Sequence, residues 1–254
     1  MPSPWYSVYV PRPAASVCLY CLPCAGGDAT MFRAWAERLP PSIELRAIRL
    51  PGRHAWHPEP VFTDCGAAAD RLALGLGPEL RPPYVLFGHS MGALLAHQLV
   101  RAVERRGLAP PALFVSAAWL VEGIPLERLP DPAAPDDRFV DRLRRLGGVP
   151  PEVLADPEVL AFTLPVLRAD YRLCRTYAYR PGQPQLGVPV RAMGGVVDSV
   201  TPVGEMESWR HHTSRFLGVS RFQGDHFFIR EHADGVVDAL AEDVAAVTAD
   251  GCVP

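Results

Sequence analysis

Hydrophobic residues along this chain fall into short runs separated by stretches with helical periodicity. The runs are rich in β-branched and aromatic residues and lie at residues 17–22, 45–50, 84–87, 112–117, 190–193 and 217–222. The helical stretches lie at residues 31–39, 65–76, 91–106, 203–212 and 233–247. Because strands that alternate with helices need crossover connections, this pattern predicts an α/β fold with a mainly parallel central sheet flanked by helices. Residues 6–10 are expected to add an edge strand.

The alternation is interrupted between residues 119 and 187. This stretch contains no segment with the pattern of a strand, and its helical patterns lie at residues 136–146, 151–155 and 157–178. A helical insertion between two strands is typical of a lid over the strand ends, where α/β folds bind their ligands. The sequence shows no internal repeat and no linker. It therefore predicts a single domain over residues 1–254, with a helical lid insertion at about residues 120–187.

Composition and charge narrow the classes of partner. The chain is 48% hydrophobic and 21% charged, as is usual for a globular protein. Its net charge of −3 provides no basic field that would attract nucleic acid. The N-terminus lacks a basic leader, and no apolar run approaches the roughly 18 residues that cross a bilayer. We therefore expect a cytoplasmic protein with reduced thiols, no nucleic-acid or membrane partner, and a monomeric state.

Three of the six cysteines follow the spacing C-x-x-C-x-x-C, at Cys18, Cys21 and Cys24. This spacing resembles part of a zinc or iron–sulfur site, but no fourth ligand follows at a matching interval. In a strand over residues 17–22, Cys18 and Cys21 would point to opposite faces of the sheet. The sequence therefore predicts buried thiols, with no metal and no cofactor.

The pentapeptide Gly88-His89-Ser90-Met91-Gly92 joins a predicted strand to a predicted helix. The two glycines allow the sharp turn that holds a serine hydroxyl above the sheet, and the next amide, at the helix N-terminus, faces a developing oxyanion. G-x-S-x-G also arises by chance in glycine-rich turns, but the flanking strand and helix are the context that the motif requires. Ser90 is therefore the predicted nucleophile, and the Met91 amide is a predicted oxyanion donor.

A serine nucleophile needs a histidine base, which a carboxylate must orient. His226 is the favoured base because it lies in a loop between a predicted strand and the last predicted helix. The other histidines considered are less favoured. His54 and His57 precede the serine, His89 lies in its turn and His97 on the helix behind it, and His211 and His212 end a helical pattern.

For the acid, Asp198 follows the predicted strand 190–193 through a short loop. Asp170 lies within a predicted helix of the insertion, and Asp225 is too close in sequence to His226 to reach its far ring nitrogen easily. Asp198 is therefore preferred, in the serine–acid–histidine order of α/β hydrolases. The second oxyanion donor is expected in the glycine-rich turn at residues 23–27, at the Ala25 amide.

With these residues assembled, the chain from about residue 17 to residue 246 resembles the stand-alone type II thioesterases of polyketide synthase and nonribosomal peptide synthetase systems, in the α/β-hydrolase superfamily. The segments that carry the resemblance are Pro23-x-Ala25-Gly26-Gly27, Leu50-Pro51-Gly52-Arg53 with Glu59-Pro60, the pentapeptide at 88–92, Leu146-Gly147-Gly148-Val149-Pro150, the segment 164–170, Gly195 with Asp198, and His226-Phe227-Phe228. The resemblance implies a triad of Ser90, Asp198 and His226. It also implies the substrate, an acyl group in thioester linkage to the phosphopantetheine arm of an acyl or peptidyl carrier protein, and a role in removing aberrant or stalled acyl groups.

Three positions depart from the family pattern. Cys24 stands where histidine or tyrosine is frequent, Asp225 replaces a frequent glycine, and Arg175 occupies a position that is often acidic. None of these departures removes a predicted catalytic group.

Two alternatives stay open. A medium-chain fatty acyl thioesterase or general carboxylesterase would use the same chemistry, and an inert binding module could share the fold.

Three arginines in the predicted insertion, Arg142, Arg144 and Arg145, could contact an acidic carrier protein or form a solvated helix face.

Overall fold

One seven-stranded sheet organises the molecule. The computed structural model describes residues 3–53 and 60–249 of the chain. The strands have the order β1-β3-β2-β4-β5-β6-β7, and all neighbours are parallel except β1, which runs antiparallel to β3. Their bounds are β1 Tyr6–Ser7, β2 Val17–Leu22, β3 Ile43–Ile48, β4 Tyr84–His89, β5 Leu113–Ala117, β6 Leu186–Gly195 and β7 Thr213–Phe222. The predicted fold class is confirmed.

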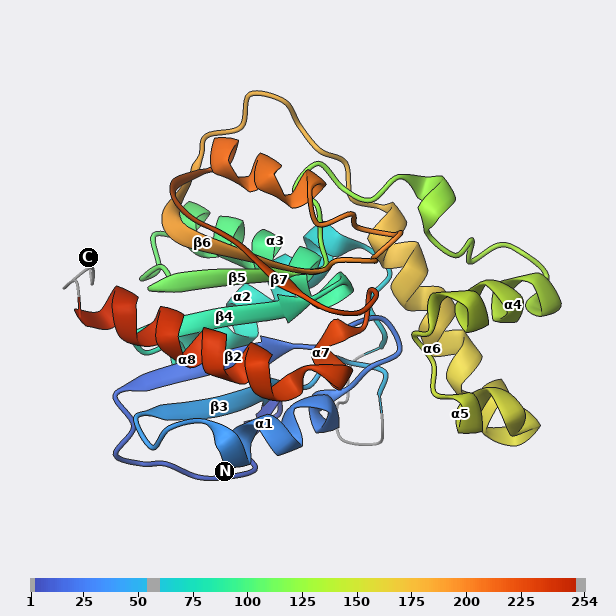
Figure 1. Cartoon of the computed structure of the whole chain (residues 1–254), viewed down its shortest axis with the longest axis horizontal. Coiled ribbons are helices and arrows are strands. Elements are labelled where there is room, and N and C mark those ends of the chain that lie inside the picture. The colour runs from blue at the N-terminus through green and yellow to red at the C-terminus, as the bar shows by residue number, and fades with distance from the viewer. Residues whose placement is uncertain (1–2, 54–59, 250–254) are drawn as a thin grey trace.

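Helices cover both faces of the sheet (Figure 1). α1 (Arg33–Arg38) and α8 (Ala233–Ala249) share one hydrophobic cluster, and α2 (Cys65–Leu76) and α3 (Met91–Arg105) contribute to the other. The remaining short helical elements are η1 (Ala29–Phe32), η2 (Gly77–Glu79), η3 (Leu126–Arg128), η4 (Glu205–His211) and α7 (Phe228–Glu231). Among the described residues, no helix is both long and apolar enough to traverse a bilayer.

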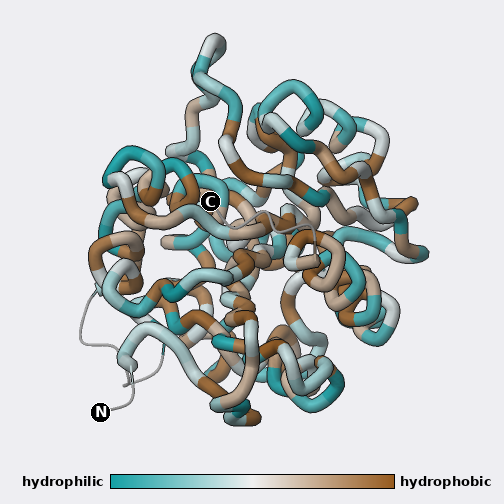
Figure 2. The backbone as a smooth tube through the Cα atoms, turned by 90° about the vertical axis from the view of Figure 1, so that its left-hand side faces the viewer, coloured by the Kyte–Doolittle hydropathy of each residue, from teal (hydrophilic) through white to brown (hydrophobic). Residues whose placement is uncertain are grey.

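The central strands β2, β4 and β5 are apolar because both of their faces are almost entirely buried. All six residues of β4 are buried, which explains why this strand reads as a continuous hydrophobic run. In β2, Cys18 packs against the cluster that contains α2 and α3, whereas Cys21 belongs to the opposite cluster, as the alternation of a strand requires. Hydrophobic segments lie mainly towards the middle of the molecule, and hydrophilic segments dominate the outer turns (Figure 2).

A helical insertion lies between β5 and β6. It contains α4 (Asp136–Leu146), α5 (Pro151–Ala155) and α6 (Pro157–Arg175), and it stands at one end of the sheet, on the right in Figure 1. α6 has two unlike halves on either side of Pro165. Before this proline Val159 and Phe162 are exposed, and after it Leu167 and Asp170 are buried. The C-terminal half of α6 is therefore part of the core, and the N-terminal half is not.

Several predicted boundaries are wrong for identifiable reasons. β6 and β7 each begin four residues before the predicted strands. The pattern did not predict these first residues because they include Gly187, Pro189 or exposed polar positions, and because β6 and β7 pair through register shifts. β3 lies two residues earlier than predicted, and the expected edge strand at 6–10 is only two residues long. Short β1 exposes little unpaired backbone, as is common at the edge of a sheet.

The predicted helices differ mainly at their ends. The stretch expected as a helix at 203–212 is the 3₁₀ helix η4, and the helix expected at 31–39 begins as the 3₁₀ turn η1, which the Asp28 side chain caps at the Thr30 amide. α6 ends at Arg175 rather than 178, where the Thr176 hydroxyl turns back to the Leu173 carbonyl. Local hydrogen bonds from the Asp28 and Thr176 side chains therefore mark these two ends.

Candidate active site

Ser90 sits at a strained turn between β4 and α3. Its φ of 54° and ψ of −119° lie in a region that residues other than glycine rarely adopt. The Ser90 N–H donates to the Ala117 carbonyl of β5 at 2.8 Å, which fixes the turn to the neighbouring strand. The predicted strand-to-helix setting of the G-x-S-x-G motif is therefore present.

The two glycines of the motif are required by close packing. A Cβ atom at Gly88 would lie 2.2 Å from the Gly92 carbonyl oxygen, and one at Gly92 would lie 2.1 Å from the Leu22 carbonyl oxygen. Both separations are far shorter than a van der Waals contact. The first turn of α3 thus packs directly on the end of β2, and no side chain fits between them.

The structure brings Ser90, His226 and Asp198 together from three separate strand ends. The His226 Nε2 atom lies 2.8 Å from Ser90 Oγ, and its Nδ1 atom lies 2.8 Å from Asp198 Oδ2. The His226 and Asp198 residues are only 3% and 5% exposed. If Nδ1 donates its proton to the carboxylate, Nε2 is left as the acceptor that a serine hydroxyl needs.

Asp198 is held as a carboxylate by donors on both of its oxygens. Oδ1 accepts from the amides of Val200 at 2.7 Å and Thr201 at 3.0 Å, and Oδ2 accepts from the Thr201 hydroxyl as well as from His226. Burial alone would raise the pKa of Asp198, but the hydrogen bonds from His226 and Thr201 outweigh it and lower the pKa below its usual 3.8. Thr201 was missed in the sequence, where its position three residues after an aspartate in a loop was the only signal.

His89 is a second residue whose role the sequence did not disclose. It is fully buried, and its Nε2 atom donates to the His226 carbonyl oxygen at 2.8 Å. Burial, reinforced by the nearby His226, lowers the pKa of His89 to about 3, so the ring is neutral and acts as a donor. Its Nδ1 atom has no partner among the described residues. His89 therefore ties the loop that carries His226 to the turn that carries Ser90.

The glycine-rich turn after β2 lies beside the insertion. The Gly27 amide donates to the Cys24 carbonyl at 3.0 Å, and Gly26 has a φ of +72°, as in a type II turn with Ala25 as its first central residue. Met91 is the first residue of α3. Among the described residues, neither the Ala25 nor the Met91 amide donates to an intramolecular acceptor. Both N–H groups are thus available to a ligand.

The cysteine that departs from the family pattern in this turn is buried. Desolvation raises the pKa of Cys24 to about 11, and its sulfur lies 3.8 Å from the Met31 sulfur. It behaves as a small apolar side chain rather than a reactive thiol. Within the part of the chain that the structure describes, no group of three or more His, Cys, Asp or Glu side chains is placed to hold a metal ion.

The alternative acids are engaged elsewhere. Asp170 accepts from the Gly26 amide at 2.7 Å and pairs with Arg53. Asp225 caps its own turn, since Oδ1 accepts from the Phe227 amide at 2.7 Å.

Apart from His89, the alternative bases that the structure describes have partners other than Ser90. His97, on α3, packs against Trp209 with ring centroids 5.2 Å apart, and His212 contacts Glu122 at 3.3 Å. His54, His57, Glu59 and Cys252 lie outside the described residues.

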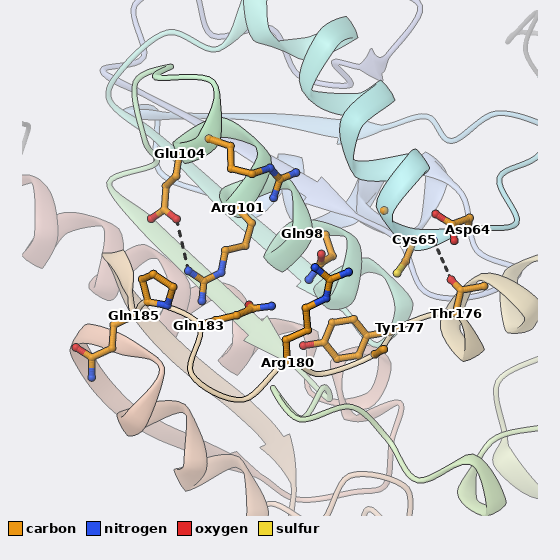
Figure 3. Close-up of a pocket in the computed structure, with 14 residues that line it drawn as sticks. Asp64, Cys65, Gln98, Arg101, Glu104, Thr176, Tyr177, Arg180, Gln183 and Gln185 are labelled. Atoms are coloured by element: carbon orange, nitrogen blue, oxygen red, sulfur yellow. Dashed lines mark hydrogen bonds and ion pairs between the residues drawn. The ribbon is translucent and has the colours of Figure 1, made fainter.

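Two cavities differ in character. One of about 470 Å³ lies between the glycine-rich turn and the insertion, and its lining includes Gly26, Gly27, Val149, Phe162, Leu167 and Arg230. The other, of about 790 Å³, lies between α3 and the segment 176–185, where Arg101 and Arg180 project among glutamine side chains (Figure 3). Only the first cavity shares residues with the turn that carries Ala25.

The basic helix face considered as a carrier contact is partly used within the insertion. Arg142 donates to the Arg128 carbonyl oxygen at 2.8 Å, and Arg145 pairs with Asp141 at 2.6 Å. Arg144 and Arg145 remain 58% and 71% exposed in their side chains.

The parallel sheet, the serine turn and the adjacent histidine and carboxylate define an α/β hydrolase. The profile of the thioesterase domain family matches residues 18–246. The gramicidin S biosynthesis protein GrsT of Aneurinibacillus migulanus is 34% identical over 237 residues, which are 93% of this chain and 92% of GrsT. Thioesterase PikA5 of Streptomyces venezuelae is 35% identical over 94% of this chain and 84% of its own length.

A solved structure agrees in both fold and sequence. The type II thioesterase BorB from the borrelidin biosynthetic cluster superposes with a TM-score of 0.82 at 33% identity, over 95% of this chain and 98% of BorB. The chain therefore belongs to the thioesterase family, within the type II thioesterases of nonribosomal peptide and polyketide biosynthesis.

Proposed function

We propose that this thioesterase hydrolyses acyl groups from the phosphopantetheine arm of an acyl or peptidyl carrier protein, with Ser90, His226 and Asp198 as its catalytic triad. The observation that carries the proposal is the continuous chain of contacts from Asp198 Oδ2 through both His226 ring nitrogens to Ser90 Oγ, each 2.8 Å long. A serine hydroxyl within hydrogen-bond distance of an imidazole that a carboxylate orients is the arrangement that acyl transfer requires.

The proposed reaction has two steps. His226 Nε2 takes the Ser90 proton while Oγ attacks the thioester carbonyl, and the Ala25 and Met91 amides hold the oxyanion. The C–S bond then breaks, the pantetheine sulfur leaves with the proton from His226, and the acyl group remains on Ser90. A water molecule, deprotonated by His226, attacks this ester; the bond between the acyl carbon and Ser90 Oγ breaks, Oγ takes the proton back from His226, and the free acid leaves. This chemistry uses no metal ion and no cofactor.

The insertion supports a role in admitting the acyl arm. We regard residues 120–187 as a lid within one domain, because its helices line the 470 Å³ cavity beside the turn that carries Ala25. Apolar lining residues such as Val149 and Phe162 suit acyl chains with modest selectivity, since one methylene discriminates by only about 1–3 kcal/mol. Such tolerance fits the removal of aberrant or stalled acyl groups of different structure.

The setting we propose is a cytoplasmic monomer that acts on carrier proteins in trans. The relatives that support a biosynthetic setting are GrsT, PikA5 and BorB. The described cysteines are free thiols, which is compatible with a reducing compartment.

Intact-mass analysis of acyl-loaded carrier proteins tests the proposal. Wild-type enzyme should return each carrier to its free-thiol mass, while Ser90→Ala should slow this by at least about 10³-fold. Ser208→Ala, which removes an exposed hydroxyl that contacts Glu122, is the matched control and should retain wild-type turnover. Turnover by Ser90→Ala within tenfold of wild type would falsify the assignment of the nucleophile. Faster hydrolysis of simple oxoesters than of carrier thioesters would instead identify a general carboxylesterase.

A further inference from the structure

A buried ion pair connects the insertion to the glycine-rich turn. Asp170, on the buried half of α6, has a side chain only 2% exposed, and Arg53 has one only 7% exposed. The Asp170 Oδ2 atom accepts from the Gly26 amide at 2.7 Å and from the Arg53 guanidinium. Arg53 also donates from Nε to the Gly27 carbonyl oxygen at 2.7 Å. The carboxylate and the guanidinium therefore hold two successive residues of the turn.

Apolar packing fixes the same turn from the same helix. A Cβ atom at Gly26 would lie 2.5 Å from Leu167 Cδ2, so the helix sits directly on the backbone of the turn. Gly26 also has a positive φ, which would strain any other residue there. The turn thus has little freedom to move without α6.

Stability alone is a weak reason to bury this pair. The desolvation of two charges offsets most of their attraction, and an apolar pair of similar size is often as stable. Burial raises the pKa of Asp170 in spite of the nearby Arg53 and the Gly26 amide. Burying this pair costs desolvation free energy, and its hydrogen bonds converge on one turn. Together these observations point to a role in positioning that turn.

We infer that Arg53 and Asp170 are positioning residues that hold the turn at residues 24–27 so that the Ala25 amide stays directed at the oxyanion. The inference rests on the proposed function, in which Ala25 is one of the two oxyanion donors. Charge that develops on the substrate oxygen is stabilised only by donors already fixed in place, because a donor that must reorient loses much of its effect. The insertion is then a structural part of the catalytic centre as well as its cover.

The test compares Asp170→Ala with a control in the same insertion. Asp136→Asn removes the charge from the contact between Asp136 and Arg168, a pair in which the Asp136 side chain is 75% exposed. With an acyl-N-acetylcysteamine thioester as substrate, Asp170→Ala should lower kcat by about 10²- to 10³-fold, the loss typical of one oxyanion donor. KM should stay within threefold, and Asp136→Asn should behave as wild type. Asp170→Asn, which keeps an acceptor but no charge, should fall between Asp170→Ala and wild type.

A second measurement separates positioning from general loosening. A trifluoromethyl ketone analogue of the thioester forms a tetrahedral adduct with the serine, and its affinity depends on the oxyanion donors. We expect its Kd to rise by the same factor by which kcat/KM falls. An unchanged Kd, a kcat within threefold of wild type, or a rise in KM alone would overturn the inference.

Folding is checked by circular dichroism and the melting temperature. If Asp170→Ala does not fold, Arg53→Lys takes its place, because lysine keeps a charge beside Asp170 but cannot also reach the Gly27 carbonyl in the same geometry. The same loss of kcat and analogue affinity is expected. A failure of the proposed function can be told apart from a failure of this inference. In the first case the Ser90→Ala variant would remain active, whatever the activity of Asp170→Ala.

Discussion

The carbonyl oxygen of His226 accepts a hydrogen bond of 2.8 Å from Nε2 of His89, the residue immediately before the serine of the sharp turn. The side chain of His226 reaches Ser90 Oγ at the same distance. His226 is therefore held at its backbone and at its ring by two consecutive residues of one turn. A displacement of the His226 loop would change the distance from Nε2 to Oγ directly.

Replacing His89 by phenylalanine should impair turnover. The variant keeps a ring in the buried site but removes the donor to the His226 carbonyl. We expect kcat to fall by about 10- to 100-fold, because small misplacements of a base are costly. The measurement is steady-state hydrolysis of an acyl thioester, with circular dichroism to show that the chain is folded.

His97→Phe is the matched control for that variant. His97 is equally buried, burial likewise lowers its pKa to about 3, and its Nε2 atom has no partner among the described residues. Phenylalanine there removes an unsatisfied polar atom, so kcat should be unchanged. Equal losses of kcat in the two variants would contradict a specific role for His89.

Gly92→Ala should strongly destabilise the protein. The added Cβ would meet the Leu22 carbonyl oxygen at 2.1 Å, and neither α3 nor β2 can move apart without disturbing the core. We expect a loss of at least about 3 kcal/mol in the free energy of unfolding, measured by urea denaturation. Gly204→Ala serves as the comparison, because nothing lies within 4 Å of a Cβ there and its stability should change by less than about 0.5 kcal/mol. Similar stability of the two variants would show that the turn can relax.

Asp198 should also make stability depend on pH. Its pKa in the folded protein is lowered, so the folded state binds this proton less readily than the unfolded chain does. The resulting stabilisation is complete above the usual pKa of 3.8 and disappears as the pH falls through the lowered value. Urea denaturation at pH 5 and pH 3 should show a smaller loss of stability for Asp198→Asn than for the wild type. Identical losses would mean that Asp198 is not held as a carboxylate.

Local patterns were sufficient to predict the sheet and the serine turn. Buried parallel strands give continuous apolar runs, and the turn that carries Ser90 is encoded within five residues, 88–92. The positions of His226 and Asp198 were accessible because each follows the end of a predicted strand. The first residues of β6 and β7 could not be predicted, since Pro189 and the register shifts between the two strands obscure the hydrophobic pattern.

Contacts between distant segments could not be predicted from pattern. Asp170 is 144 residues from Gly26 and 117 from Arg53, so its sequence position as a candidate acid within a helix gave no sign of either contact. His89 was visible as part of the motif, but its acceptor is a backbone atom 137 residues away. Side chains that position catalytic groups from a distance become apparent only when the fold brings the segments together.

Arg230 should control the motion of the turn between α4 and α5. Its guanidinium donates to the carbonyl oxygens of Gly147 at 3.2 Å and Gly148 at 2.9 Å, and it lies 4.4 Å from the centroid of the Phe227 ring. Because Phe227 follows the proposed base His226, this contact links the insertion to the catalytic loop. Arg230→Met removes the donors but keeps an apolar side chain of similar length.

We expect Arg230→Met to expose the backbone of residues 147–155 to faster hydrogen–deuterium exchange, because local opening is limited by the few contacts that close it. Arg145→Met is the control within the same insertion, since Arg145 is 71% exposed and pairs only with Asp141 of its own helix among the described residues. Exchange in 147–155 should be unchanged in that variant. If Arg230→Met also leaves exchange unchanged, the apolar packing of α6 holds the insertion in place, rather than the hydrogen bonds from Arg230 to Gly147 and Gly148. The Arg230 side chain would then contribute only its contact with the Phe227 ring.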